Sequence, residues 1–260
     1  MAENRQPLDG KQLAELMRLI DDADSVELKM TVPDADSRST IRSLELDPIE
    51  AQIRQIVFFD TPDLSLNGNG LVVRARRSQG APDDSVIKLR PVVPSEVPEE
   101  LRRTTDFNVE VDAMPGGYVC SASYKGKIPA GEVKRVLQGD QQIRKLFSKP
   151  QRAFYDQHAP DGVKLEDLSV LGPITALKLK WQPTDFKRRM VAELWFYPDG
   201  SRILELSTKC KPAEAFQVAA ETKAFLTAKG IDLAGQQATK TKMALGYFAG
   251  GAAQPAASTP

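Results

Sequence analysis

The sequence predicts an α+β protein built on a closed eight-stranded antiparallel β-barrel (a tunnel) with helices attached to it. Three observations lead to this fold class. Apolar and charged residues alternate along many short segments, glycine-rich turns separate several of these segments, and helical spacing is confined to the two ends and one insertion. Eight or nine short strands with hairpin-like links are typical of an antiparallel sheet that closes into a barrel.

The strands are predicted from a hydrophobic period of two. Alternation begins at residues 25–32, where Val26 and Leu28 point to one face and Glu27 to the other. The same pattern predicts strands at 41–47, 54–60, 71–77, 85–92, 106–113, 174–181, 188–196 and 202–209. Residues 67–70, Asn-Gly-Asn-Gly, are predicted to form a hairpin turn, because no Lys-Ser/Thr follows them as in a phosphate loop.

Helices are predicted outside these strands. Residues 8–23 show an amphipathic pattern that Asp9 can cap, and residues 130–158 form a helical insertion. The region 212–248 is helical again, with Gly230 as a stop. We therefore divide the chain into an N-terminal helical extension at 1–23, one barrel domain at 24–248 with its insertion at about 130–160, and a disordered tail at 249–260.

Composition excludes several classes of protein. The 260 residues carry 35 Lys and Arg against 35 Asp and Glu, so no chain-wide positive field favours a nucleic-acid polymer or a membrane surface as partner. The single histidine, His158, argues against a His-based metal site or a Ser-His-Asp triad. Cys120 and Cys210 form no disulfide framework. Neither a membrane span nor a signal peptide is recognisable, and the cytoplasm is the expected location.

Basic residues recur in pairs on the polar faces of the predicted strands. The pairs are Arg74 with Arg76, Lys88 with Arg90, and Lys178 with Lys180, and single residues are Lys29 and Lys209. One explanation is a sheet with one solvated face of mixed charge. The clustering favours another explanation, because like charges on adjacent strands repel unless an anion lies between them. A polyphosphate needs several such cations, and Arg binds phosphate oxygens in pairs.

Acidic residues occupy the same kind of position, at Glu27, Glu110, Asp112, Glu193 and Glu205. Carboxylates can hold the Lys and Arg side chains in place. They can also bind Mg²⁺ or Mn²⁺, which prefer oxygen ligands and bridge phosphates. The sequence therefore predicts a site for a polyphosphate or nucleotide, with Mg²⁺ or Mn²⁺ as cofactor.

At these residues the chain resembles the CYTH family, the triphosphate tunnel metalloenzymes. Glu27-Leu28-Lys29 is similar to the end of the family's Glu-x-Glu-x-Lys signature. The most recognisable stretch is Phe59-Asp60-Thr61-Pro62-Asp63-Leu64, continued by residues 70–76. Further similar motifs are Lys88-Leu89-Arg90, Glu110-Val111-Asp112, Leu171-Gly172-Pro173 and Thr241-Lys242. The likeness runs from about residue 25 to about residue 245.

The resemblance implies hydrolysis of a triphosphate-containing small molecule: inorganic triphosphate, a nucleoside triphosphate or thiamine triphosphate. The implied phosphate-binding residues are Lys29, Arg74, Arg76, Lys88, Arg90, Lys178 and Lys180. Glu27, Glu205 and Glu193 are implied metal ligands, and Glu110 and Asp112 are implied to act in catalysis by supporting the site or positioning water. The family's oligomeric states vary, and a homodimer is one arrangement left open.

Two departures from the family pattern leave other functions open. Ser25 stands where the signature has its first Glu, and Ser207 stands where the family often has a second acid after Glu205. Fewer carboxylates weaken the affinity for a cation and the positioning of water. The alternatives to a metal-dependent triphosphatase are therefore a polyphosphate or nucleotide-binding module without turnover, and an adenylate cyclase of the same fold.

Overall fold

The computed structural model describes residues 9–232 and 240–251. Within these residues nine strands form a closed barrel in the order β1-β5-β6-β4-β3-β2-β7-β8-β9. The predicted tunnel fold with attached helices is thus confirmed, with nine strands where we expected eight. The sheet is mixed, because β1 pairs in parallel with β5 and antiparallel with β9.

The chain divides into two compact units, which we describe in turn. The first comprises the described parts of Met1–Ile53, Leu89–Ser123 and Ala176–Gln237, and the second those of Arg54–Lys88, Tyr124–Thr175 and Ala238–Pro260. The strands are β1 Ser25–Val32, β2 Gln52–Asp60, β3 Leu71–Ser78, β4 Asp83–Leu89, β5 Phe107–Met114, β6 Gly117–Ile128, β7 Ser169–Trp181, β8 Met190–Phe196 and β9 Arg202–Cys210. β6 and β7 each run from one unit into the other.

Helices flank the strands of both units. The α-helices are α1 Gly10–Asp21, α2 Ser37–Ser43, α3 Ser65–Gly68, α4 Glu99–Arg102, α5 Glu132–Leu137, α6 Lys149–His158, α7 Ala215–Ala228 and α8 Lys240–Gly251. The 3₁₀ turns are Asp34–Asp36, Pro48–Glu50, Pro94–Glu96, Ile143–Leu146, Leu165–Asp167 and Pro212–Glu214. The predicted helices at the N-terminus, in the insertion and near the C-terminus are therefore present. Most of the predicted disordered tail lies outside the described residues, and α8 continues to Gly251.

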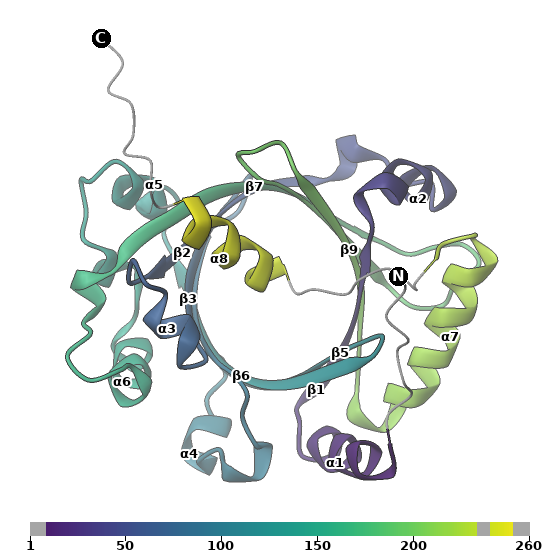
Figure 1. Cartoon of the computed structure of the whole chain (residues 1–260), viewed down its shortest axis with the longest axis horizontal. Helices are drawn as coiled ribbons and strands as arrows, with labels where there is room; N and C mark the ends of the chain where they lie inside the picture. The colour runs from purple at the N-terminus through teal and green to yellow at the C-terminus, as the bar shows by residue number, and fades with distance from the viewer. Residues whose placement is uncertain (1–8, 233–239, 252–260) are drawn as a thin grey trace. The chain divides into compact units, whose positions relative to one another are not determined.

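In the first unit, α1 and α7 lie outside the strands β1 and β9 (Figure 1). α1 begins where predicted, since the Asp9 carboxylate accepts the backbone N–H groups of Lys11 and Gln12, and the Gln12 side chain bonds back to Asp9. The apolar core of this unit joins residues of β1, β8 and β9 to α7 and the segment after α2. Its buried members include Met30, Val32, Leu44, Leu46, Met190, Leu204, Leu206, Phe225 and Leu226.

In the second unit, β2 and β3 pair antiparallel, with Phe58 opposite Arg74 and Ile56 opposite Arg76. The connection between them is short and is held by Asp60, which is almost fully buried. Its carboxylate accepts the backbone N–H groups of Leu66 at 2.9 Å and Asn67 at 3.0 Å. These bonds hold the helical turn α3 in place, and Gly70, at φ +77°, leads from it into β3. Asp60 belongs to the most recognisable family-like stretch, residues 59–64, and this stretch thus helps to form the connection between β2 and β3. Residues 67–70 do link two paired strands, as predicted, although Asn67 and Gly68 end a helical turn.

The helical insertion packs onto the second unit through Gln151 of α6. Its buried amide nitrogen donates to the backbone carbonyls of Ser85 at 3.2 Å and Tyr124 at 3.1 Å, and its amide oxygen accepts from the Ser85 hydroxyl. The same amide oxygen accepts the backbone N–H of Ser148 in the capping box of α6. Phe147 meets Phe59 edge to face, with ring centroids 6.1 Å apart. The insertion is therefore tied to β2, β4 and β6 by both polar and apolar contacts.

Two segments differ from the sequence-based expectation. The strand predicted at 41–47 was wrong, because residues 37–43 form α2, and Leu44 and Leu46 then enter the core of the first unit. In this short run the apolar residues Ile41 and Leu44 fit a helical spacing as well as a strand pattern. β6 was not predicted, since its buried positions include Ser121 and Ser123 and carry only a weak apolar signal.

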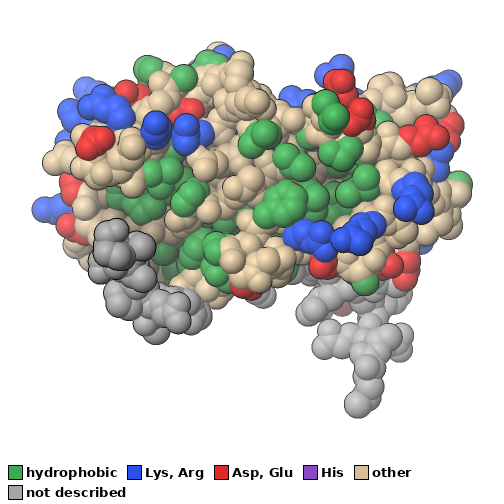
Figure 2. Space-filling model, turned by 90° about the horizontal axis from the view of Figure 1, so that it is seen from above, with side chains coloured by type: hydrophobic (Ala, Val, Ile, Leu, Met, Phe, Trp, Pro, Cys, Tyr) green, Lys and Arg blue, Asp and Glu red, His purple; other side chains and the backbone are tan. Residues whose placement is uncertain are grey.

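The surface carries both signs of charge. On the face shown in Figure 2, Lys and Arg side chains lie among Asp and Glu, with apolar side chains between them. Cys120 and Cys210 are free and buried. Among the residues described, no helix is both long and apolar enough to cross a membrane.

Candidate metal and phosphate site

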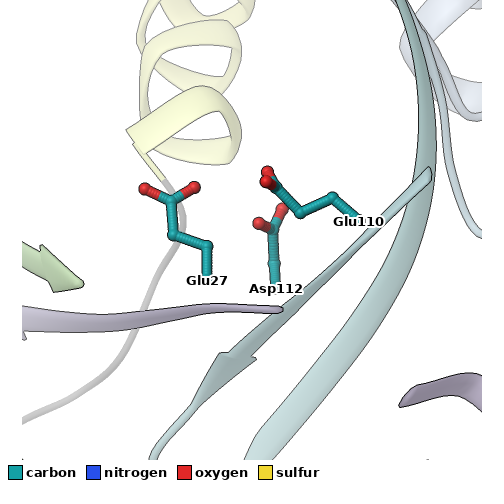
Figure 3. A group of neighbouring side chains, drawn as sticks. All are labelled: Glu27, Glu110 and Asp112. Carbon is teal, nitrogen blue, oxygen red and sulfur yellow. The ribbon is translucent and has the colours of Figure 1, made fainter. Parts of the chain in front are cut away.

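Three adjacent strands of the first unit bring the predicted acidic residues together. β1 lies between β5 and β9, and its register places Ser25 opposite Glu110 and Glu27 opposite Asp112. Since alternate residues of a strand share one face, all four side chains lie on the same side. One carboxylate oxygen from each of Glu27, Glu110 and Asp112 lies within 4.8 Å of the others, and the three side chains converge (Figure 3).

Lys29 pairs with two of the three carboxylates of this cluster. Its ammonium lies 2.7 Å from Asp112 Oδ1 and 3.1 Å from Glu27 Oε2, and only 17% of the side chain is exposed. Burial by itself lowers the pKa of Lys29, but the carboxylates of Asp112, Glu27 and Glu205 outweigh it and hold that pKa well above its ordinary value. Lys29 is therefore charged at neutral pH, as an anion-binding group must be.

Glu110 is held by two groups from the neighbouring strands. The Ser25 hydroxyl donates to Glu110 Oε2 at 3.2 Å, and the Lys209 ammonium forms an ion pair with the same oxygen. The sequence showed Ser25 as a missing acid and Lys209 as a single basic residue. It contained no signal that the two meet at one carboxylate, because that contact depends on how β5, β1 and β9 are aligned.

The other two acids lie on β8 and β9. Glu205 is buried and lies opposite Glu193, an arrangement of like charges that needs nearby cations. Lys178 supplies one of them, with its ammonium 2.7 Å from Glu193 Oε1, and the Trp195 indole donates to Glu193 Oε2 at 3.3 Å. Burial, with the Glu205 charge as a second cause, also raises the pKa of Tyr197.

Arg90 and Lys180 complete the predicted phosphate-binding residues of the first unit. Burial lowers the pKa of the Arg90 guanidinium, and the nearby Asp112 carboxylate opposes that shift. Arg90 is thus partly buried and within electrostatic reach of the acidic cluster. Lys180 lies at an exposed position near the end of β7.

The second unit contains Arg74, Arg76 and Lys88 on β3 and β4. The Arg76 guanidinium makes a close, multidentate ion pair with Asp84, with Nε at 2.9 Å from Oδ1 and 3.1 Å from Oδ2. Asp84 was not among the predicted site residues. Its pairing with Arg76 fixes the orientation of that guanidinium.

The cluster on β1 and β5 has a donor set that fits a divalent cation. Three carboxylates offer the oxygen ligands that Mg²⁺ and Mn²⁺ prefer, and their close approach fits one ion. The group consists of Glu27, which the resemblance implies as a metal ligand, and of Glu110 and Asp112, for which we expected a catalytic role; all three assignments stay predictions. Glu205 and Glu193 lie outside that group of three, and their roles as ligands stay predictions from the sequence.

Structural comparison places the chain among proteins of the same fold. No protein-family model matches it, and no curated protein matches it by sequence. Among solved structures it is similar to HpAC1 from Hippeastrum, a candidate adenylyl cyclase described as having a dominant triphosphatase activity. The TM-score is 0.60 at 15% identity, covering 85% of this chain and 95% of that one. It is also similar to a candidate adenylate cyclase from Bacillus halodurans, with a TM-score of 0.57 at 14% identity over 85% and 97% of the two chains.

These comparisons show the fold. The chain has the closed-barrel fold of these two proteins, in agreement with its resemblance to CYTH domains.

Proposed function

We propose that this protein hydrolyses a triphosphate-containing small molecule with the help of Mg²⁺ or Mn²⁺. The observation that carries the proposal is the convergence of Glu27, Glu110 and Asp112, two of which, Glu27 and Asp112, pair with the buried ammonium of Lys29. A group of carboxylates that can bind a cation, next to a lysine that is charged at neutral pH, suits a substrate that arrives as a metal–polyphosphate complex. Inorganic triphosphate, a nucleoside triphosphate and thiamine triphosphate are the candidate substrates.

Each group has a role that its surroundings allow. Glu27, Glu110 and Asp112 would hold the cation, which when bound would neutralise phosphate charge. Lys29, Arg90 and Lys178 bind phosphate oxygens, since all three are cations with restricted exposure. A carboxylate oxygen of the cluster orients water toward the terminal phosphorus. The water oxygen forms a bond to that phosphorus while the bond from the phosphorus to the bridging oxygen breaks. One water proton passes to the carboxylate that oriented the water, and inorganic triphosphate and water yield phosphate and diphosphate.

The predicted residues Arg74, Arg76 and Lys88 extend this proposal. They belong to the second unit, and their role in phosphate binding rests on the sequence. An Arg74→Ala/Lys88→Ala double variant should weaken binding of triphosphate if that prediction is correct.

The test is phosphate release from inorganic triphosphate, ATP and thiamine triphosphate with Mg²⁺ and with Mn²⁺. We expect turnover that Glu110→Gln or Asp112→Asn lowers by at least about 100-fold. Glu99→Gln is the matched control, because Glu99 is an exposed acid of the same unit that pairs only with Arg103 among the ion pairs described. The absence of phosphate release from all three substrates with either metal would refute the proposal.

A second candidate function is binding without turnover. The observation in its favour is that Ser25 and Ser207 are buried on the strand faces next to the cluster, where they supply hydroxyls in place of carboxylates. Thermal stabilisation by triphosphate without phosphate release would support a binding module. Cyclic AMP and diphosphate formed from ATP would instead indicate an adenylate cyclase.

A further inference from the structure

Lys209 lies at the edge of the acidic cluster and is not among the residues that the resemblance assigns. It occupies β9 directly opposite Glu27 of β1, while its ammonium pairs with Glu110 of β5, on the far side of β1. The Lys209 side chain is 48% exposed, whereas that of Glu110 is only 12% exposed. A long, half-exposed side chain therefore reaches from β9 across one strand to a mostly buried carboxylate.

Ser25 explains why this lysine is accommodated. Its hydroxyl donates to Glu110 Oε2, the same oxygen that Lys209 contacts. A carboxylate at position 25 would add a negative charge beside Glu110 and favour a multivalent cation there. A hydroxyl adds no charge, so a monovalent ammonium is sufficient to balance Glu110.

The two ammonium groups of the cluster differ in how easily they can leave it. Lys29 is buried, pairs with two carboxylates and is further stabilised by Glu205. Lys209 is half exposed, and its ion pair among the described residues is with Glu110. Ion pairs of exposed lysines contribute little free energy, whereas buried pairs are costly to break. Lys209 is therefore the cation that can be exchanged.

We propose that Lys209 and a divalent cation are alternative partners of Glu110, so that Lys209 sets how tightly the cluster binds the cation. This inference rests on the divalent cation of the proposed function. Because the ammonium must leave Glu110 before that carboxylate can bind the ion, the lysine lowers the apparent affinity for Mg²⁺ or Mn²⁺. Lys209 is a residue that tunes the site; it is not a cation ligand.

The experiment measures Mn²⁺ binding to the full chain by calorimetry and by the electron paramagnetic resonance signal of free Mn²⁺. Lys209→Met should raise the affinity about fivefold, which corresponds to about 1 kcal/mol, the upper range for an exposed ion pair. Lys209→Arg keeps the charge and should stay within about twofold of the unaltered protein. Lys223→Met on α7 removes an exposed lysine elsewhere in the unit and controls for net charge. Glu110→Gln should lose most of the binding.

The outcomes separate this inference from the proposed function. Equal or weaker Mn²⁺ binding by Lys209→Met, in a protein that melts like the unaltered chain, overturns the inference. So does Mn²⁺ binding that Glu110→Gln leaves intact, or no binding by any variant. If the protein releases phosphate but Lys209→Met leaves the Mn²⁺ affinity unchanged, only the inference about Lys209 is refuted. If Lys209→Met raises the Mn²⁺ affinity but no variant releases phosphate, only the proposed hydrolysis is refuted.

Discussion

Replacing Lys29 by methionine tests whether the acidic cluster depends on its buried ammonium for stability. Methionine retains the length and apolar character of the side chain but leaves Asp112 and Glu27 without their shared cation. The Asp112 side chain is 3% exposed, so water cannot hydrate its carboxylate in place of the lysine. The Glu27 side chain is 25% exposed, so its charge is partly screened by solvent. Breaking a buried pair in this way costs about 3–5 kcal/mol.

We expect Lys29→Met to lower the free energy of unfolding by about 3 kcal/mol, the lower end of that range, because Lys29 and Glu27 retain some contact with solvent. The contribution must be measured near neutral pH. The pKa of Lys29 is raised in the folded state, so its stabilisation is fully present below the ordinary value of 10.5 and is lost as the pH rises through the higher folded value.

The assay is urea unfolding of Lys29→Met, Asp112→Asn and the double variant, with Lys223→Met as an exposed control. Once Asp112 is neutral, the loss of Lys29 should cost less, giving a favourable coupling of at least about 1 kcal/mol. A Lys29→Met protein within about 0.5 kcal/mol of the unaltered one would refute the reasoning, as would strictly additive effects in the double variant.

Three further predictions concern other residues. Gln151→Leu should cost about 3 kcal/mol in urea unfolding, because the carbonyls of Ser85 and Tyr124 lose their donor; a loss below about 1 kcal/mol would contradict this. Burial lowers the pKa of His158 in the folded protein. The contribution of the neutral imidazole to the free energy of unfolding is therefore fully present above the ordinary pKa of 6.5 and is lost as the pH falls through the lower folded value. Between about pH 7.5 and pH 5.5 the melting temperature should therefore fall less for His158→Gln than for the unaltered chain, and an equal fall in both proteins would count against this. Ser25→Glu should raise Mn²⁺ affinity about tenfold in calorimetry, and unchanged affinity would show that position 25 lies outside the ligand shell.

The strand pattern could be predicted because it is local. Side chains alternate faces along any strand, so Glu27 and Lys29, or Glu110 and Asp112, could be assigned to one face from their spacing alone. The helix at 8–23 was predictable for the same reason, since Asp9 and the first turn lie within a few residues. Short runs were less certain, and residues 41–47 show that a few apolar residues fit both periods.

The pairing of strands was not predictable from these patterns. The parallel pairing of β1 with β5 joins distant segments through backbone hydrogen bonds, which any residue can make, so it leaves no trace in side-chain spacing. The ion pair of Asp84 with Arg76 and that of Lys209 with Glu110 were not predicted for the same reason, because each depends on which strands lie next to one another in the folded chain.

The sequence alone thus determined the barrel class and the kinds of charge at its alternating positions, because both depend on local periodicity. The tertiary structure decided which carboxylates meet and which cation each one holds. It aligned β1 with β5 so that Glu27 joins Glu110 and Asp112, and it placed Glu193 of β8 against Lys178 of β7. The physical reason is strand register, since displacing one strand by a single residue turns its side chains to the other face and disperses the cluster.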